Sequence, residues 1–246
     1  MRVNGEAVLL VDYEAELARL KAADQKLNKT STLEDQKKQV LDSMIEQSLL
    51  VQAALDGGFK LDETELDARI GRLAEELGGE EALTAWQNEN GYTVQSFRRA
   101  LTRSIAAAWQ RDKILAAVPK TAEQVHAVQI FVVDPDEAAN IKSRLDSGAE
   151  FATLVEEYDP LTKGDLGWFP RGYLFKPEVE EAAFNLEPGQ VSAVVKSDIG
   201  YHIIKVMERD PQRQLNSDAY LAVQRLTFSS WLEKQRSESQ IETLIK

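Results

Sequence analysis

The 246-residue chain has no cysteine and only two histidines, His126 and His202. Without thiols it can form no disulfide, no thiolate nucleophile and no cysteine-based zinc site. The two histidines are far apart in the sequence, and neither belongs to an HxxxH or HExxH pattern, so a histidine-based metal site has little support. We therefore expect no metal and no cofactor.

Long apolar runs and positive charge are also scarce. No segment approaches the roughly 20 apolar residues that cross a bilayer, and the start, MRVNGEAVLLVDYE, lacks the order of a signal peptide. The 29 Lys and Arg residues against 41 Asp and Glu residues give a formal net charge of -12, which repels phosphate backbones. We expect no nucleic-acid binding. The hydrophobic fraction of 43% is enough for the cores of one large or two ordinary domains.

The first stretch of the chain, up to Pro119, is predicted to be mainly helical. The segment from Val3 to Asp12 favours an extended conformation that is opened by the turn pair Asn4-Gly5. Ser31-Thr-Leu-Glu34 has the form of a capping box, which predicts the start of a helix. Apolar residues then recur at helical spacing up to Pro119. The predicted helices cover residues 31–55, 62–77 and 93–118, with a shorter one around Leu83 and Trp86.

The stretch after Pro119 alternates between strand and helix patterns. The order predicted is strand, three helices and two strands, with a linker at 119–123. The tail from Gln212 to Lys246 is again helical and amphipathic, and such a helix needs a partner surface, which the first stretch supplies. The predicted elements after the linker are strands 125–132, 191–197 and 201–208, and helices 136–148, 151–158 and 176–186.

Two motifs in this stretch carry the most information. GDLGWF at 164–169 and GYHIIKV at 200–206 frame the shorter motifs EEAAF at 180–184 and PGQVS at 188–192. In kind, order and approximate spacing these motifs resemble the second half of a parvulin-type peptidyl-prolyl cis-trans isomerase. The resemblance implies a parvulin domain, which has an FKBP-like antiparallel sheet.

The whole layout is similar to the bacterial foldases and periplasmic chaperones of the PrsA and SurA kind. VNGE near the start and LDSMIEQSLLVQAA at 41–54 carry this second resemblance. It implies an α+β fold, in which a helical SurA-N-like chaperone module built from both chain ends carries an inserted parvulin domain. The implied limits are 1–120 for the N-terminal module, 121–210 for the parvulin-like domain and 211–246 for a C-terminal helix that packs on the module.

The resemblance also implies the polar residues of a site. His202 in GYHIIKV corresponds to the second histidine of the family, whereas the position of the first histidine holds Gln129. The loop before GDLG is shorter than in the family, and Asp159 is our candidate for its acidic residue. Ile199 stands where the family often has Ser or Thr. The alternatives are that His202 is a core histidine and that Asp159 is a turn residue, since Asp-Pro favours turns.

The proline pocket follows by the same correspondence. Leu174 takes the position of the family's Met or Leu, Val179 that of its pocket Phe, and Phe184 that of the aromatic residue in the AAF segment. Phe175 is a further candidate for substrate binding. Because Val179 is smaller than phenylalanine, we expect a shallower pocket. The alternative is that some of these side chains are ordinary core.

These resemblances predict an extracytoplasmic protein-folding factor. Its partners would be unfolded or partly folded polypeptides that contain proline, and it would isomerise X-Pro bonds of secreted clients with weak catalysis at most. The alternative is a client-binding chaperone with a degenerate, inactive parvulin domain. We expect a location in the periplasm or at the outer face of the cell membrane, after removal of a signal or lipoprotein segment. Any membrane anchor would lie in a segment absent from this chain, and the oligomeric state is left open.

Overall fold

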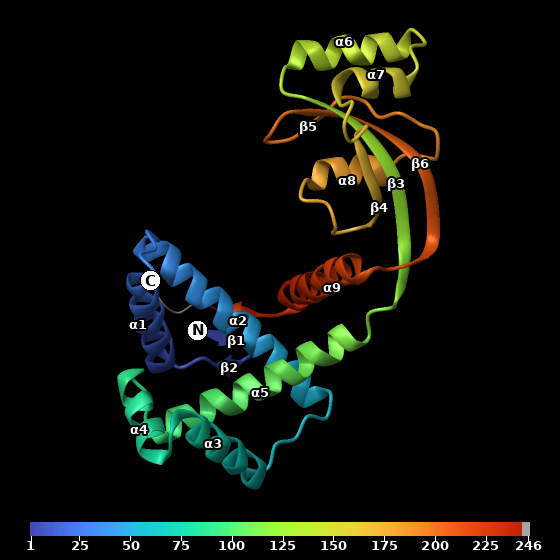
Figure 1. Cartoon of the computed structure of the whole chain (residues 1–246). Coiled ribbons are helices and arrows are strands. Elements are labelled where there is room, and N and C mark those ends of the chain that lie inside the picture. The colour runs from blue at the N-terminus through green and yellow to red at the C-terminus, as the bar shows by residue number, and fades with distance from the viewer. Residues whose placement is uncertain (243–246) are drawn as a thin grey trace. The chain divides into compact units, whose positions relative to one another are not determined.

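The computed structural model describes residues 1–242 and divides the chain into two compact units. Unit 1 contains Met1–Ala116 and the segment that starts at Phe228, and unit 2 contains Ala117–Thr227. Figure 1 shows mainly helices in unit 1 and a sheet with helices in unit 2, which confirms the predicted α+β class. The domain limits 1–120, 121–210 and 211–246 stay a prediction.

Unit 1 is organised around two long helices, α2 and α5. They pack through a cluster that includes Val51, Ala54 and Ala106, and the two alanines are 0% and 2% exposed. Because alanine side chains are small, the two helix backbones can approach closely at this point. The five helices of residues 1–116 are α1 (Leu10–Lys26), α2 (Leu33–Asp56), α3 (Glu63–Leu77), α4 (Glu80–Glu89) and α5 (Val94–Ala116).

A capping box starts α2, one residue later than the sequence suggested. The Thr32 hydroxyl accepts a hydrogen bond from the backbone N–H of Asp35, and the Asp35 carboxylate accepts one from the backbone N–H of Thr32. Ser31 instead donates to the carboxylate of Asp24, near the end of α1. The predicted box of Ser31 and Glu34 is therefore wrong, because the hydroxyl of Ser31 is committed to the preceding helix.

The two chain ends meet in a small antiparallel sheet with the strand order β2-β1-β7. β1 (Arg2–Val3) turns through Asn4 and Gly5, which have φ values of 52° and 82°, into β2 (Glu6–Ala7). The other neighbour of β1 is β7 (Ile241–Glu242). The extended conformation predicted up to Asp12 is too long, since α1 already begins at Leu10.

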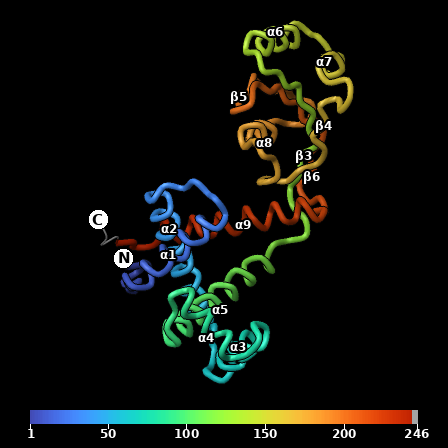
Figure 2. Tube along the Cα trace, turned by 60° about the vertical axis from the view of Figure 1, so that its left-hand side comes forward, coloured from blue at the N-terminus to red at the C-terminus, as the bar shows by residue number. Residues whose placement is uncertain are grey.

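Unit 2 contains an antiparallel sheet of four strands in the order β4-β3-β6-β5. β3 and β6 form its centre and lie side by side in both views (Figures 1 and 2). The elements of unit 2 up to residue 214 are β3 (Thr121–Val132), α6 (Pro135–Asp146), α7 (Phe151–Tyr158), β4 (Asp165–Pro170), α8 (Pro177–Phe184), β5 (Val195–Lys196) and β6 (Tyr201–Gln214).

Helices cover both faces of this sheet. Ile203 packs with α6 and α7 on one face, whereas its neighbour Ile204 packs with α8 on the other. Such alternation follows from the two-residue period of a strand. Since both faces are covered, the apolar residues Ile203, Ile204 and Val206 of β6 are buried, and their polar neighbour His202 is 3% exposed. That burial determines the chemistry of the site.

The strand pairing of this sheet corrects three sequence-based predictions. β3 begins at Thr121, inside the predicted linker, because residues 121–125 pair with 209–214 of β6. The same pairing keeps 212–214 out of the predicted tail helix. That helix, α9, covers Ser217–Glu238 and is followed by β7; residues 243–246 lie outside the described part of the chain. In 191–197 only Val195–Lys196 form a strand, together with a single bridge from Val191 to Lys205.

The sequence also left β4 unpredicted, although it pairs with β3 from Gln124 to Val128. Among residues 1–242, no helix has the length and apolarity that a membrane span requires.

Candidate functional site

His202 lies at the centre of a neutral hydrogen-bonded cluster in unit 2. In the sheet it is paired with Phe131, whose ring centroid is 5.0 Å from that of the imidazole. Gln129, two residues before Phe131 on β3, projects from the same face, and its Oε1 is 2.8 Å from His202 Nδ1. Ser197 approaches from the other side, with its Oγ 2.8 Å from His202 Nε2.

For a neutral imidazole, these contacts place the ring hydrogen on Nδ1. The carbonyl oxygen of Gln129 can only accept, so Nδ1 carries a hydrogen and donates it. Nε2 of the neutral ring then accepts from the Ser197 hydroxyl, whose oxygen also accepts from the N–H of Ile199 at 3.3 Å. Both ring nitrogens of His202 are therefore engaged within the protein.

The electrostatics of the cluster agree with a neutral ring. Burial lowers the pKa of His202, and Lys176 lowers it further, whereas the carboxylate of Glu178 opposes both effects. A pKa below the ordinary histidine value leaves the ring uncharged at neutral pH. Such a site can shape and hydrogen-bond a substrate, but it provides no cation.

Ser197 was not among the residues that the sequence singled out. It directly follows β5, and the β5–β6 turn folds it back so that its N–H donates to the carbonyl of Gly200 at 2.8 Å. Its five-residue separation from His202 gives no helical or strand-period signal. One feature of the sequence could have identified Ser197. It stands just before the turn of a tight hairpin, and the second strand of that hairpin carries His202.

Asp159 serves the loop that supports Gln129. Its carboxylate accepts hydrogen bonds from the N–H of Thr162 at 3.0 Å, from the Thr162 hydroxyl and from the N–H of Gly164 at 3.1 Å. The Thr162 hydroxyl is the main cause that lowers the pKa of Asp159. Gly164 in turn accepts from the backbone N–H of Gln129 at 2.9 Å. The hydrogen bonds of Asp159 thus lead to the backbone of Gln129 and not directly to the imidazole.

The apolar candidates separate into two groups. Val179 and Phe184 are 3% and 4% exposed and belong to the core cluster under the sheet, against which Leu174 packs while half-buried. Phe175 is 98% exposed and projects away from that cluster. The structure therefore brings Leu174, Val179 and Phe184 together and leaves Phe175 at the surface.

A concave surface of the molecule lies within unit 1. A groove of about 960 Å³ is formed by α1, α2 and the start of α5. Its lining includes Val8, Leu9, Val11 and Met44, and Leu9 and Val11 are 46% and 62% exposed. Ion pairs between arginines of α5 and acidic residues near the chain start cross it: Arg99 with Asp12 at 3.3 Å and Arg103 with Glu6 at 3.8 Å.

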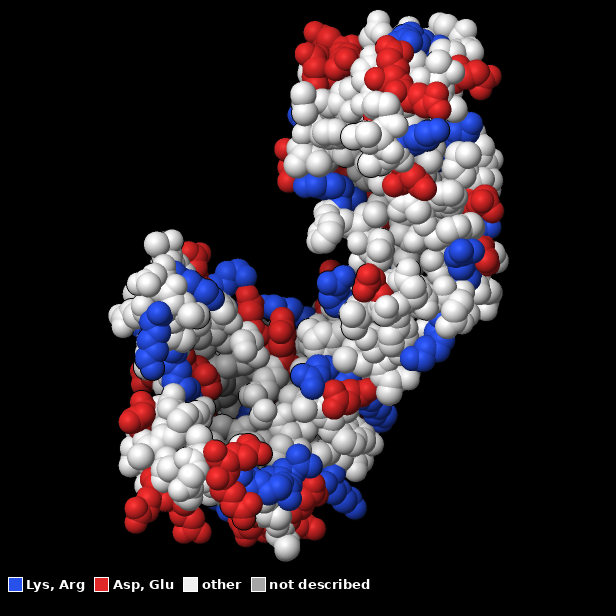
Figure 3. Space-filling model, viewed as in Figure 1, with Lys and Arg blue, Asp and Glu red and all other residues white. Residues whose placement is uncertain are grey.

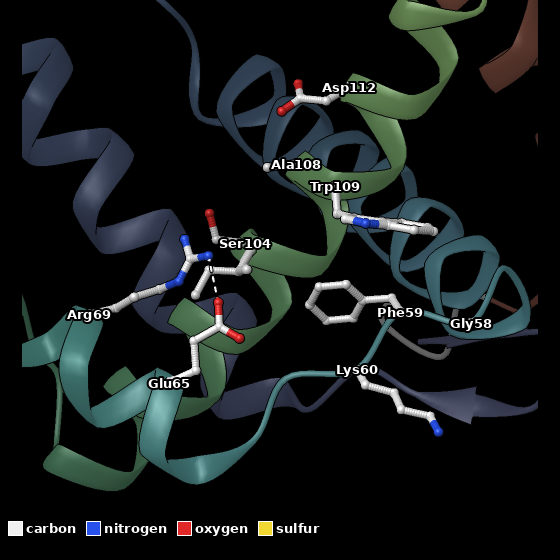
Figure 4. Close-up of a pocket in the computed structure, with 10 residues that line it drawn as sticks. Gly58, Phe59, Lys60, Glu65, Arg69, Ser104, Ala108, Trp109 and Asp112 are labelled. Carbon is white, nitrogen blue, oxygen red and sulfur yellow. Dashed lines mark hydrogen bonds and ion pairs between the residues drawn. The ribbon is translucent and has the colours of Figure 1, made fainter.

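A smaller cavity of about 580 Å³ lies between α3 and α5 (Figure 4). Phe59 and Trp109 face each other across one side, with ring centroids 5.7 Å apart. On the other side the guanidinium of Arg69 is 2.9 Å from the carboxylate of Glu65. Acidic and basic side chains are interspersed over the visible face of both units (Figure 3).

Two protein families match consecutive parts of this chain. The PPIC-type PPIASE domain matches residues 114–208, and the SurA-like N-terminal domain matches residues 1–110. The first match covers the sheet of unit 2 up to Glu208, and the second covers α1 to α4 and most of α5. Both parts of the predicted fold, the helical SurA-like module and the parvulin-type sheet domain, are thereby confirmed.

Individual relatives cover nearly the whole chain. The foldase protein PrsA of Geobacillus sp. (strain WCH70) is 33% identical over an alignment of 252 positions, which covers 99% of this chain and 87% of the relative. The foldase protein PrsA of Caldanaerobacter subterraneus subsp. tengcongensis is 31% identical over 82% of this chain and 71% of its own length. A crystal structure of the peptidylprolyl isomerase PrsA from Bacillus cereus has the same fold, with a TM-score of 0.50, 23% identity, and 89% and 92% of the two chains covered.

Proposed function

The chain belongs to the PrsA family of foldases with a parvulin-type domain, and from this premise we propose that it isomerises X-Pro bonds weakly while it holds unfolded clients. As a member of this family it is a folding factor with a peptidyl-prolyl isomerase domain. We further propose that its clients are secreted polypeptides that contain proline. Its place of action would be outside the cytoplasm, where a chain without cysteine has no thiol to protect from oxidation.

The reaction requires rotation and no covalent step. The barrier to turning an X-Pro bond, about 18–20 kcal/mol, comes from amide resonance, and the twisted amide has lost much of that resonance. A site therefore accelerates the reaction when it binds the twisted amide more tightly than either planar form. In this proposal Leu174, with Val179 and Phe184 behind it, holds the proline ring, while His202, Gln129 and Ser197 form the polar wall beside the turning carbonyl.

The observation that carries the proposal of weak catalysis is the closed neutral cluster. Both nitrogens of His202 are engaged, at 2.8 Å each, with uncharged partners. A hydrogen bond to the substrate carbonyl would require one of these bonds to open. Asp159, our acidic candidate, would act indirectly through the loop at 159–164. Phe175 would contact only the chain flanking the proline.

A protease-coupled tetrapeptide assay tests the isomerase proposal. We expect an isomerisation rate above the uncatalysed background but well below that of an intact parvulin. Leu174→Ala and His202→Ala should each lose most of the rate above background. His126→Ala is the matched control, because that histidine lies on the same strand pair with Nε2 2.9 Å from Asp165 and outside the cluster. Gln129→His should raise the rate by restoring the second imidazole. A full parvulin rate in the unchanged protein would contradict the proposal of weak catalysis.

The groove of unit 1 favours a second function, client binding without catalysis. Its exposed apolar lining suits an extended apolar segment, and aggregation of an unfolded client reports on it independently of isomerisation. We expect Val11→Glu to reduce protection against aggregation several-fold. Val94→Glu is the control, since Val94 is also in a first helical turn and 67% exposed but does not line the groove. Equal protection by both variants would exclude the groove as the holding site.

A further inference from the structure

The loop between β4 and α8 carries Leu174, and a single carboxylate anchors its start. Glu180, in the first half of α8, accepts hydrogen bonds from three successive backbone N–H groups. Its Oε1 is 2.7 Å from the nitrogen of Gly172, and its Oε2 is 2.9 Å and 3.0 Å from the nitrogens of Tyr173 and Leu174. The side chain thus ties the loop to the helix that follows it.

This arrangement requires an anion with two acceptor oxygens. Gly172 has a φ of 81°, a left-handed conformation that turns its N–H toward the same point as the next two. Successive N–H groups that converge in this way form a concave site for negative charge. Glu180 supplies that charge from within the protein and satisfies all three donors at once.

The anchor fixes the candidate pocket residue relative to the histidine. Leu174 is held through its own N–H while its side chain packs on the core cluster that contains Val179, from the same helix as Glu180. At the far end of the loop, Lys176 forms an ion pair with Asp198 in the β5–β6 turn, next to Ser197. The loop is therefore fastened on one side to α8 and on the other to the hairpin that carries the His202 cluster.

We propose that Glu180 is a positioning residue for proline binding: it sets the distance between Leu174 and the His202 cluster by clamping the backbone at residues 172–174. The proposal rests on the proposed function, since it assigns Leu174 to the proline pocket. Glu180 touches no substrate in this scheme. Its effect on turnover passes entirely through Leu174.

The substitution Glu180→Gln isolates this role. The glutamine amide has one acceptor oxygen and one NH₂ group, so at least one backbone N–H would face a donor. Glu181→Gln is the matched control, because it is the adjacent residue of the same helix, removes the same charge, and is exposed at the surface. Both variants should keep the fold, which the thermal midpoint and the near-ultraviolet circular dichroism would verify.

Hydrogen exchange in the 246-residue chain measures the clamp itself. In Glu180→Gln we expect the amides of residues 172–174 to exchange about tenfold faster, as for loss of a hydrogen bond to a charged group, with the amides of β3 and β6 unchanged. Glu181→Gln should leave all of them unchanged. Unaltered protection of the three amides in Glu180→Gln would overturn the proposal.

A double-mutant cycle then tests the route to proline binding. The ligand is a proline tetrapeptide, and both its affinity, from NMR titration, and kcat/KM are measured. In the protein that keeps Leu174, we expect Glu180→Gln to lower both the peptide affinity and kcat/KM about fivefold to tenfold. In the Leu174→Ala variant, the same substitution should change neither quantity appreciably. An equal loss in both backgrounds would show a role in general stability and overturn the proposal. If the unchanged protein binds the peptide without turnover, the isomerase proposal fails, and the affinity cycle still decides the role of Glu180.

Discussion

At the scale of single residues, His202 is distinguished by hydrogen bonds within the protein at both of its ring nitrogens. Gln129 accepts from one nitrogen, and Ser197 donates to the other. A second histidine at the position of Gln129 could share or exchange protons with the imidazole, whereas an amide cannot change its charge. The cluster is therefore a neutral polar surface. It is stable while the imidazole of His202 stays uncharged, because burial disfavours the charged ring.

The first prediction concerns the pH dependence of that stability. Burial lowers the pKa of His202 in the folded state, and the ordinary value is about 6.5. Between the folded and unfolded pKa values the unfolded chain binds more protons, so the free energy of unfolding falls as pH drops below about 6.5. The slope reaches at most about 1.4 kcal/mol for each pH unit, and stability is complete above that range.

Unfolding of unit 2 in urea, followed from pH 7.5 to 5.5, checks this prediction. Asp159 and Asp165, whose pKa values are lowered, titrate below that window and do not interfere. The variant His202→Gln should lose the slope even if its absolute stability differs. Parallel slopes for the variant and the unchanged protein would assign the dependence to another group.

Residue correspondence could identify part of the site in advance. His202 and Gln129 were predicted as one polar cluster, and they lie within hydrogen-bonding distance because strand positions two apart share a face. Ser197 and Glu180 were not predicted. Each makes its contacts across a turn or a loop, and residue spacing in the sequence does not predict the geometry of such segments. The roles of Asp159 and the pocket residues stay predictions.

At the scale of elements, periodicity identified helices well and misjudged strands. Helical segments are stabilised by a repeating apolar face that is visible in the sequence, as in α5. The limits of β3 and β6 instead depend on each other: Thr121 is a strand residue because it pairs with Gln214. No local sequence pattern predicts a strand partner that is 93 positions away. The same dependence hid β4 and β7.

The second prediction uses two glycines around the start of β4. A Cβ added at Gly164, with φ at 62°, would lie 1.9 Å from the backbone oxygen of Gln129, whereas one added at Gly167, with φ at 67°, would meet open space. Both alanine variants bear the left-handed backbone cost, roughly 1–2 kcal/mol. Only Gly164→Ala must also push the strands apart, so we expect it to cost at least about 2 kcal/mol more.

Urea unfolding of the two variants measures that difference. Gly164→Ala should also disturb the NMR resonances of Gln129 and His202, because the displaced strand carries one partner of the cluster. Similar stabilities for Gly164→Ala and Gly167→Ala would mean that the approach of residue 164 to β3 is looser than the structure shows.

At the scale of the whole molecule, the chain closes on itself within unit 1. Asn4 joins three segments: its side chain donates to Gln52 of α2 at 2.9 Å and to Ser239 at 3.1 Å, and accepts from the N–H of Gln240 at 2.9 Å. Its backbone N–H donates to the carbonyl of Gln240 at 2.8 Å. The start of the chain, a central helix and the segment after α9 are thus held by one residue, which makes the chain ends part of one cooperative structure.

The third prediction compares Asn4 with Asn28. Both asparagines have a φ of 52°, so replacement by alanine costs each the same backbone strain, roughly 1 kcal/mol. Asn4→Ala additionally loses three side-chain hydrogen bonds and should destabilise unit 1 by about 2 kcal/mol more. Hydrogen exchange shows which part of the chain is destabilised. We expect faster exchange at β1 and Gln240, with β3 and β6 unchanged, because the hydrogen-bond partners of Asn4, which are Gln52, Ser239 and Gln240, belong to unit 1. Equal exchange in the two variants would show that the side-chain hydrogen bonds of Asn4 do not hold the chain ends together, and would leave that role to the pairing of β1 with β7 and the packing around Val3.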